Sequence, residues 1–318
     1  PFGHLGESAV KEWFSDTKNG CPAVGDLQVF DGNPQGFRLM SFLAGADNYG
    51  LNLTCTLLLS TVKYPWNLND RPAGKKIGLF TSDFAIYRSA CNELHWEPGK
   101  HFPFMRLMDT ADEIAYSMSD LEDGLEKNII SEDDLKTKFP AHFPAGGVLK
   151  PFVEFKTKVI NWAVEAAADS FSNNIDGILA GQDLNLIDKS TEIGDLLKQV
   201  SQFARARIYS DEAAEKVELA GRSVIKGLLN HFGELLKLPE DDFLALIEND
   251  REKIKDRSLD FQIRLLRRLP KSYLEKYQAT GRGSETERRS HLLVDFISGM
   301  TDDFALETYQ VLEGIRIK

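Results

Sequence analysis

Four groups of residues in this 318-residue chain carry polar side chains at spacings that could support chemistry. The first group lies at the beginning of the chain, where His4 and Glu7 are three residues apart. If a helix begins there, the two side chains are neighbours, and a carboxylate beside an imidazole orients the ring and raises its basicity. Such a pair suits general acid–base chemistry near neutral pH. The alternative interpretation is a surface ion pair, which is the commoner use of this spacing.

The second group lies on a helix predicted between Leu107 and Asp123. At about 100° per residue, Asp112, Tyr116 and Asp120 share one face of this helix. The opposite face is apolar and comprises Leu107, Ala111, Ile114, Met118 and Leu121. Carboxylate oxygens are suitable ligands for Mg²⁺ or Mn²⁺, and a tyrosine between two aspartates could pack against a sugar ring. The alternative is an amphipathic surface helix whose acidic face is solvated.

The third group combines side-chain amides with two lysines, and the fourth is a stripe of basic residues. Asn33 or Gln35, in a glycine-flanked turn, could donate amide hydrogens to an anion, although Asn33 could equally cap a helix. Lys63 follows a helix-like run and Lys76 opens a possible strand. The stripe consists of Arg264, Arg267, Arg268 and Lys271. It could meet a polyanion or an acidic subunit face, but a solvated face is the default interpretation.

Composition excludes several classes of protein. Hydrophobic residues make up 42% and charged residues 27%, so the chain can bury a sizeable core and is not disordered. A net charge of −11 argues against a polybasic nucleic-acid coat. The three cysteines have no CxxC spacing and are interpreted as reduced thiols of a cytoplasmic protein, not as a zinc site. No run approaches the roughly 18 apolar residues of a membrane span, so no membrane association is expected.

Apolar spacing predicts a mostly helical chain. We expect helices over 104–125, 151–172, 210–238 and 258–269, and loops at the Pro/Gly clusters 32–36, 65–74, 97–103 and 140–147. Residues 76–80 are interpreted as one short strand and the polar tract 279–287 as a mobile loop. The prediction is therefore an all-α fold with few short strands, forming one large helical domain over 1–318 around one continuous core.

Several segments together resemble the deoxyguanosine triphosphate triphosphohydrolases (dGTPases) of the HD-domain superfamily. The resemblance lies in Pro1–Glu7, Asp31–Arg38, Leu51–Thr54, Lys63–Trp66, Leu107–Tyr116, Asp120–Asp123 and Asp295–Asp302, with a weaker match at Lys216–Gly221. These segments occur in the family's order.

The resemblance implies water attack on the α-phosphorus of dGTP or another dNTP, which releases a deoxynucleoside and inorganic triphosphate. His4 would be the catalytic histidine, Glu7 would orient it, and Asp112 would be the last ligand of a Mg²⁺ or Mn²⁺ ion that lowers the pKa of the attacking water. The implied substrate-binding residues are Asn33, Lys63, Tyr64, Lys76, Tyr116 and Asp120. Family members are all-α and typically hexameric, and some bind single-stranded DNA, for which residues 264–271 are the natural place to test.

The chain also departs from the family pattern. The upstream His and the adjacent His-Asp ligands are absent, and we expect the natural protein to carry them on roughly 100 further N-terminal residues. The present chain alone is then expected to bind metal poorly and to hydrolyse little. Two alternatives stay open: a catalytically silent homologue that binds nucleotide or single-stranded DNA, and a different HD phosphohydrolase such as a nucleoside monophosphatase. The second is disfavoured because Lys63 and Lys76 suit a long phosphate tail.

Overall fold

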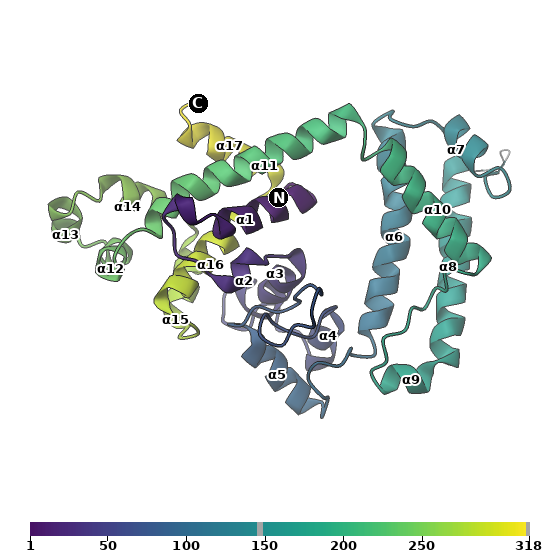
Figure 1. The fold of residues 1–318 in the computed structure, drawn as a ribbon, viewed down its shortest axis with the longest axis horizontal. Coiled ribbons are helices and arrows are strands. Elements are labelled where there is room, and N and C mark those ends of the chain that lie inside the picture. The colour runs from purple at the N-terminus through teal and green to yellow at the C-terminus, as the bar shows by residue number, and fades with distance from the viewer. Residues whose placement is uncertain (145–148, 316–318) are drawn as a thin grey trace. The chain divides into compact units, whose positions relative to one another are not determined.

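The computed structural model describes residues 1–144 and 149–315, and within these ranges it contains helices, turns and loops but no strand (Figure 1). The all-α prediction is confirmed, whereas the predicted short strand at 76–80 is wrong. Contacts divide the chain into two compact units. The first comprises Pro1–Leu58, Tyr64–Leu94 and Val217–Lys318, and the second comprises Leu59–Lys63 and His95–Lys216. The prediction of one continuous core is wrong, because two separate clusters of buried apolar residues occur.

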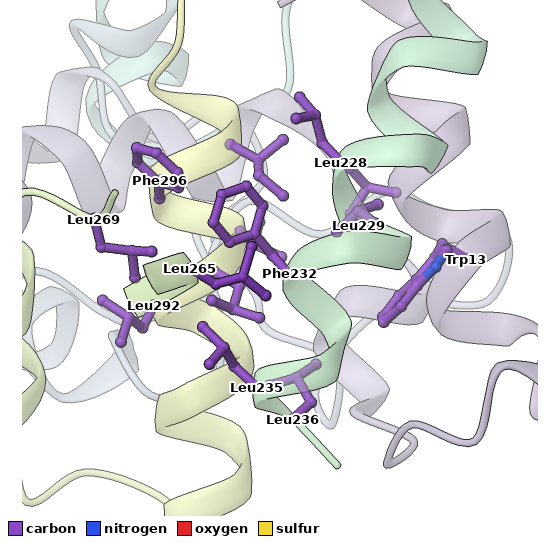
Figure 2. Close-up of a cluster of buried hydrophobic side chains, with 14 of the residues drawn as sticks. Trp13, Leu228, Leu229, Phe232, Leu235, Leu236, Leu265, Leu269, Leu292 and Phe296 are labelled. Atoms are coloured by element: carbon purple, nitrogen blue, oxygen red, sulfur yellow. The ribbon is translucent and has the colours of Figure 1, made fainter. Parts of the chain in front are cut away.

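Among the described residues, ten α-helices lie entirely within the first unit. In chain order they are α1 (Gly3–Ser15), α2 (Gly25–Gln28), α3 (Gly32–Arg38), α5 (Phe84–Glu93), α12 (Glu240–Glu248), α13 (Arg251–Asp256), α14 (Asp260–Leu266), α15 (Lys271–Ala279), α16 (Glu285–Ser298) and α17 (Asp302–Leu312). Helices α4 (Cys55–Ser60) and α11 (Glu212–Phe232) cross the boundaries between the units. Figure 2 shows the core of this unit, where Phe232 of α11 meets Phe296 of α16 edge to face, with the ring centroids 5.3 Å apart.

The second unit is built on three long helices, α6 (Met105–Glu126), α8 (Pro151–Asn173) and α10 (Glu192–Arg207), with the shorter α7 (Glu132–Lys138) and α9 (Ile175–Leu179). Helix α6 packs against both α8 and α10. The aromatic centre of its core is Phe139, whose ring lies 5.7 Å from that of Phe155 and 5.9 Å from that of Phe203. Across 1–144 and 149–315, no helix combines the length and apolar character that crossing a membrane requires.

The apolar face of α6 is turned relative to its prediction. Ile114, Met118 and Leu121 are buried as expected, but Leu107 is 41% exposed and Ala111 is also exposed. The buried stripe instead includes Thr110, Ser117 and Gly124. An added Cβ at Gly124 would lie 2.6 Å from Ile208, so glycine permits this close packing.

Other predicted elements are confirmed in part. Helices α6 and α8 lie within one residue of their predicted bounds. Helix α11, predicted over 210–238, ends at Phe232. Its first half is exposed, and the side chain of Val217 is 57% exposed. Residues 32–36, predicted as a loop, are helical because Asp31 caps α3 by accepting the amide of Asn33. Of the tract 279–287, residues 285–287 begin α16, where Ser284 and Glu287 form a capping box. The predicted loop at 140–147 lies partly outside the described residues.

The segment around Gly78 is a buried turn and not a strand. The amide of Gly78 donates to the carbonyl of Trp66 at 3.2 Å, and Trp66 Nε1 donates to the carbonyl of Lys76 at 2.6 Å. Ile77 and Leu79 are fully buried on either side of the bend. The turn therefore fixes the backbone on which Lys76 and Tyr64 stand.

We expect Gly78→Ala to lower the free energy of unfolding by about 1–3 kcal/mol. An added Cβ would lie 2.1 Å from the carbonyl oxygen of Tyr64, which is backbone and cannot turn away. Gly36→Ala is the matched control, because nothing lies within 4 Å of its Cβ position and alanine favours the interior of α3 by up to about 1 kcal/mol. Urea denaturation measures both variants, and equal stability of the two would contradict the prediction.

Candidate functional site

The first candidate pair stands at the start of α1. His4 Nδ1 lies 3.2 Å from Glu7 Oε2, so the predicted neighbourhood is confirmed. The other carboxylate oxygen of Glu7 accepts the amide of Gly32 at 2.9 Å. A Cβ at position 32 would lie 2.7 Å from that oxygen, so glycine is required for this approach. Glu7 thus connects the His4 ring to the first turn of α3, while the His4 side chain itself is 92% exposed.

Asp31 holds two of the predicted phosphate contacts. Its Oδ1 accepts the Asn33 amide nitrogen at 3.1 Å and the Asn33 side-chain nitrogen at 2.6 Å, and its Oδ2 pairs with Lys76 Nζ at 2.8 Å. Burial alone would raise the pKa of the Asp31 carboxyl, but the hydrogen bonds from Lys76 and Asn33 outweigh burial and lower it. The same ion pair raises the pKa of Lys76. Lys76 therefore stays charged, with its side chain half exposed.

Tyr64 completes this cluster in the first unit. Its ring centroid lies 6.2 Å from that of Trp66, and both Glu7 and Tyr64 lie close enough to raise the pKa of Lys76 electrostatically. The structure thus brings His4, Glu7, Asn33, Tyr64 and Lys76 together. Sequence reasoning missed Asp31 at the centre, although an Asp two residues before Asn33 is a recognisable cap signal.

Gln35 does not serve as a free amide donor, contrary to expectation. Its Nε2 donates to Asp295 Oδ1 at 2.9 Å. Asp295 in turn pairs with Arg38 at 2.9 Å, and Arg38 also pairs with Asp83 at 3.0 Å. All three charged side chains are buried. This network anchors α3, and with it the turn that carries Asn33.

The network keeps Arg38 charged in the interior. Burial by itself would lower the pKa of Arg38, but the charges of Asp295 and Asp83 outweigh it and raise that pKa. Burial raises the pKa of the Asp83 carboxyl, although Arg38 acts in the opposite direction.

The remaining candidates lie in the second unit, on α6 or beside it. Lys63 forms an ion pair with Asp109 of α6. The side chains of Asp112 and Tyr116 are exposed, and that of Tyr116 is 62% exposed. Asp120 accepts a hydrogen bond from the Tyr209 hydroxyl at 2.8 Å, and burial raises the pKa of the Asp120 carboxyl. The predicted acidic and aromatic face of α6 is therefore accessible, with Asp120 already oriented by a neighbour.

Asp112 does not stand in a metal cluster. Among the residues that the structure describes, no group of three or more His, Cys, Asp or Glu side chains is placed to hold a metal ion. One exposed carboxylate does not fit the requirements of a Mg²⁺ or Mn²⁺ site, which needs several oxygen ligands.

The basic stripe is not one helical face. Helix α14 ends at Leu266, so Arg267 and Arg268 lie beyond it and Lys271 begins α15. Arg264 donates to the carbonyl of Asp260, and Arg267 donates to Asn249 at 3.1 Å. The prediction of a single basic stripe is wrong, because the chain turns between α14 and α15.

Comparison with known proteins agrees with this assembly of motifs. Residues 261–311 match the phosphohydrolase-associated domain family. The chain is 28% identical to a probable deoxyguanosinetriphosphate triphosphohydrolase of Pseudomonas aeruginosa, over 99% of this chain and 75% of that protein. It is 29% identical to a deoxyguanosinetriphosphate triphosphohydrolase-like protein of Listeria monocytogenes, over 99% of this chain and 74% of that protein. It is 27% identical to a deoxyguanosinetriphosphate triphosphohydrolase of Enterobacter sp., over 99% of this chain and 76% of that protein.

The chain is thus a helical protein related to phosphohydrolases. More narrowly, the relationship to the dGTPase family of the HD-domain superfamily, predicted from the motifs, is confirmed.

Proposed function

We propose that this protein hydrolyses dGTP or other deoxynucleoside triphosphates to a deoxynucleoside and inorganic triphosphate. In this reaction a bond forms between the water oxygen and the α-phosphorus, and the bond from that phosphorus to the 5′ oxygen breaks. The single observation that carries the proposal is the similarity to deoxyguanosinetriphosphate triphosphohydrolases along 99% of the chain.

His4 is assigned the acid–base step at the scissile bond. Glu7 occupies the Nδ1 side of the ring at 3.2 Å, which leaves Nε2 as the nitrogen that exchanges a proton with substrate or water. The 92% exposure of the side chain gives a substrate access to that nitrogen. Glu7 is a positioning residue, because its second oxygen is held by the Gly32 amide and cannot turn away freely.

Asn33, Tyr64, Lys63 and Lys76 are assigned to the phosphate groups. An ammonium has three donors, so the ion pair of Lys76 with Asp31 leaves donors of Lys76 for phosphate oxygens. The Lys76 side chain is 50% exposed and that of Lys63 is 35% exposed, so both reach solvent. Fixed positive charge at these positions stabilises the negative charge that the phosphate gains in the transition state.

Tyr116 and Asp120 are assigned to the sugar. The exposed ring of Tyr116 offers an apolar surface to a deoxyribose. The Tyr209 hydroxyl fixes one oxygen of Asp120 and leaves the other for a sugar hydroxyl.

A requirement for Mg²⁺ or Mn²⁺ is part of the proposal. Asp112 would be one ligand, and the other ligands would have to come from outside the residues that the structure describes. Hexamer formation, binding of single-stranded DNA and a cytoplasmic location stay predictions.

We expect full-length protein incubated with dNTP and Mn²⁺ in ¹⁸O-labelled water to release triphosphate that carries the label, and unlabelled deoxynucleoside. Attack on the α-phosphorus requires this distribution because the water oxygen remains on phosphorus. Anion-exchange chromatography and mass spectrometry resolve the products for each of the four dNTPs. Release of single orthophosphates would reject the mechanism. Binding of dNTP without any hydrolysis would instead identify the catalytically silent alternative.

A further inference from the structure

The backbone immediately before His4 forms a tight turn. Phe2 has a φ of 58° and a ψ of 31°, and Gly3 has a φ of 52°, so both residues lie in the left-handed region. The amide of Gly6 donates to the carbonyl of Phe2 at 3.1 Å. A Cβ at Gly6 would lie 2.2 Å from the carbonyl oxygen of Pro1, so glycine is required for this close approach. The chain is therefore folded back on itself at the point where α1 begins.

The left-handed conformation is unusual at Phe2. Glycine adopts a positive φ without steric cost, and asparagine and aspartate tolerate it, whereas an aromatic residue rarely adopts it. Strained residues of this kind persist only where the surrounding structure over-determines them, and they cluster at active sites. Contacts from outside the turn must therefore hold Phe2 in this conformation.

Two contacts from distant parts of the chain hold Phe2. Its amide donates to Oδ1 of Asp302, the first residue of α17, at 2.9 Å. Its side chain lies on Gly221 of α11, where an added Cβ would be 2.3 Å from Cγ and 2.4 Å from Cβ of Phe2. Phe2 also packs against the apolar core of the first unit. Figure 1 shows the start of the chain beside α11 and α17.

These contacts give a role to two motif segments that the assignments above leave unused. Gly221 is the last residue of the segment Lys216–Gly221, and Asp302 is the last residue of the segment Asp295–Asp302. Each segment thus ends at a residue that contacts Phe2, two positions before His4.

His4 depends on this turn for its position. Its side chain is 92% exposed, so packing against neighbours does not hold it. Glu7 orients the ring from 3.2 Å but does not fix the backbone that carries the ring. That backbone is fixed by the turn at Phe2, and the turn is fixed by α11 and α17.

We propose that Gly221 and Asp302 are positioning residues that hold His4 in place at the start of α1. The effect on turnover rests on the proposed function, in which His4 exchanges a proton with substrate or water. Proton transfer requires hydrogen-bond distance, and a misplacement of about 1 Å can cost about 10²-fold in rate. Neither residue touches the substrate, so both act through the backbone of Phe2.

Steady-state kinetics of the full-length protein with dGTP and Mn²⁺ tests the role of Gly221. We expect Gly221→Ala to lower kcat about 10–100-fold and to change KM less than about 3-fold, because His4 transfers a proton and does not hold the phosphates. The overlap falls on Cβ of Phe2, which is fixed to the backbone, so rotation of the ring does not relieve it.

Gly227→Ala is the matched control in the same helix. Its Cβ would overlap only outer ring atoms of Tyr309, which can rotate away, so kcat should stay within about 2-fold of wild type. A loss of kcat in Gly227→Ala as large as that in Gly221→Ala would overturn the proposal, because the effect would then follow from any disturbance of α11.

The hydrogen bond to Asp302 is tested separately. Asp302→Ala removes the acceptor and should lower kcat at least about 10-fold. Asp302→Asn keeps an acceptor oxygen and should restore kcat to within about 3-fold of wild type. Asp303→Ala is the control, because it removes an exposed acid from the same first turn of α17 and should change kcat less than about 2-fold. Equal losses in Asp302→Ala and Asp303→Ala would contradict the assignment.

A second substitution at Phe2 makes the test of Gly221 specific. Phe2→Gly removes the overlapping Cβ and suits the positive φ at that position. We therefore expect Gly221→Ala to cost less than about 3-fold in kcat when Phe2→Gly is already present. A full additional loss in the double variant would show that Gly221 does not act through Phe2.

Hydrogen exchange measured by mass spectrometry separates position from chemistry. The Phe2 amide should exchange at least about 5-fold faster in Asp302→Ala, as the loss of one hydrogen bond predicts. The Gly6 amide should exchange faster in Gly221→Ala. Unchanged exchange in both variants would overturn the proposal, as would faster exchange without loss of kcat while His4→Ala is impaired. If His4→Ala keeps its turnover, the proposed role of His4 fails, and the exchange rates alone decide whether Gly221 and Asp302 hold the turn.

Discussion

His4→Ala is expected to lower the turnover of dNTP at least about 10²-fold while leaving the melting temperature unchanged. General acid–base groups contribute about 10²–10⁴ in rate, and the alanine side chain cannot transfer a proton. The His4 side chain is 92% exposed, and among the residues that the structure describes its hydrogen-bond partner is Glu7 alone, so its removal opens no cavity. Steady-state kinetics and thermal unfolding of the full-length variant measure the two quantities.

Two further variants make this result specific. His95→Asn removes an exposed imidazole elsewhere and keeps a residue that tolerates the positive φ of 51° at that position, so turnover should stay near the wild-type value. Glu7→Gln should give an intermediate loss, because the ring nitrogen remains while its anionic partner is removed. Unchanged turnover in His4→Ala would remove His4 from the site.

Arg38→Met is expected to lower the free energy of unfolding by about 3–5 kcal/mol, the typical cost of removing one member of a buried ion pair. The variant would leave Asp83 and Asp295 buried without their shared counter-charge, and both side chains are at most 3% exposed. The methionine side chain fills much of the same space, so lost packing is a minor part of the effect. Urea denaturation measures the change.

The loss of unfolding free energy in Arg38→Met should be smaller at pH 5 than at pH 8. Burial already raises the pKa of Asp83 in the wild-type protein, and without the opposing charge of Arg38 the Asp83 carboxyl takes up a proton more readily. A carboxyl whose folded pKa exceeds its unfolded pKa binds protons more tightly in the folded state, so lowering the pH stabilises the folded variant.

Arg268→Met serves as the control for charge removal, since Arg268 is exposed and should contribute less than about 0.5 kcal/mol. Adding Asp83→Asn to Arg38→Met should restore part of the stability and reduce the dependence on pH. A loss below about 1 kcal/mol in Arg38→Met would mean that the buried network does not anchor α3.

Features decided within a few residues were predictable from the sequence. Helices α6 and α8 lie within one residue of their predicted bounds because apolar spacing and helix signals act over single turns. The His4–Glu7 contact follows from its i, i+3 spacing once α1 begins at Gly3. The all-α class follows from the same local patterns, and the motifs indicated the dGTPase family.

Only the tertiary structure decided which groups are paired and which are free. Gln35 donates to Asp295, which is 260 residues away, and Asp31 pairs with Lys76 across a buried turn. The tertiary packing also turned the buried face of α6 toward Thr110 and Ser117 and divided the apolar residues between two cores. Such contacts join segments whose separation along the chain carries no information on their distance in space. They depend on how whole helices pack, which local propensity does not encode.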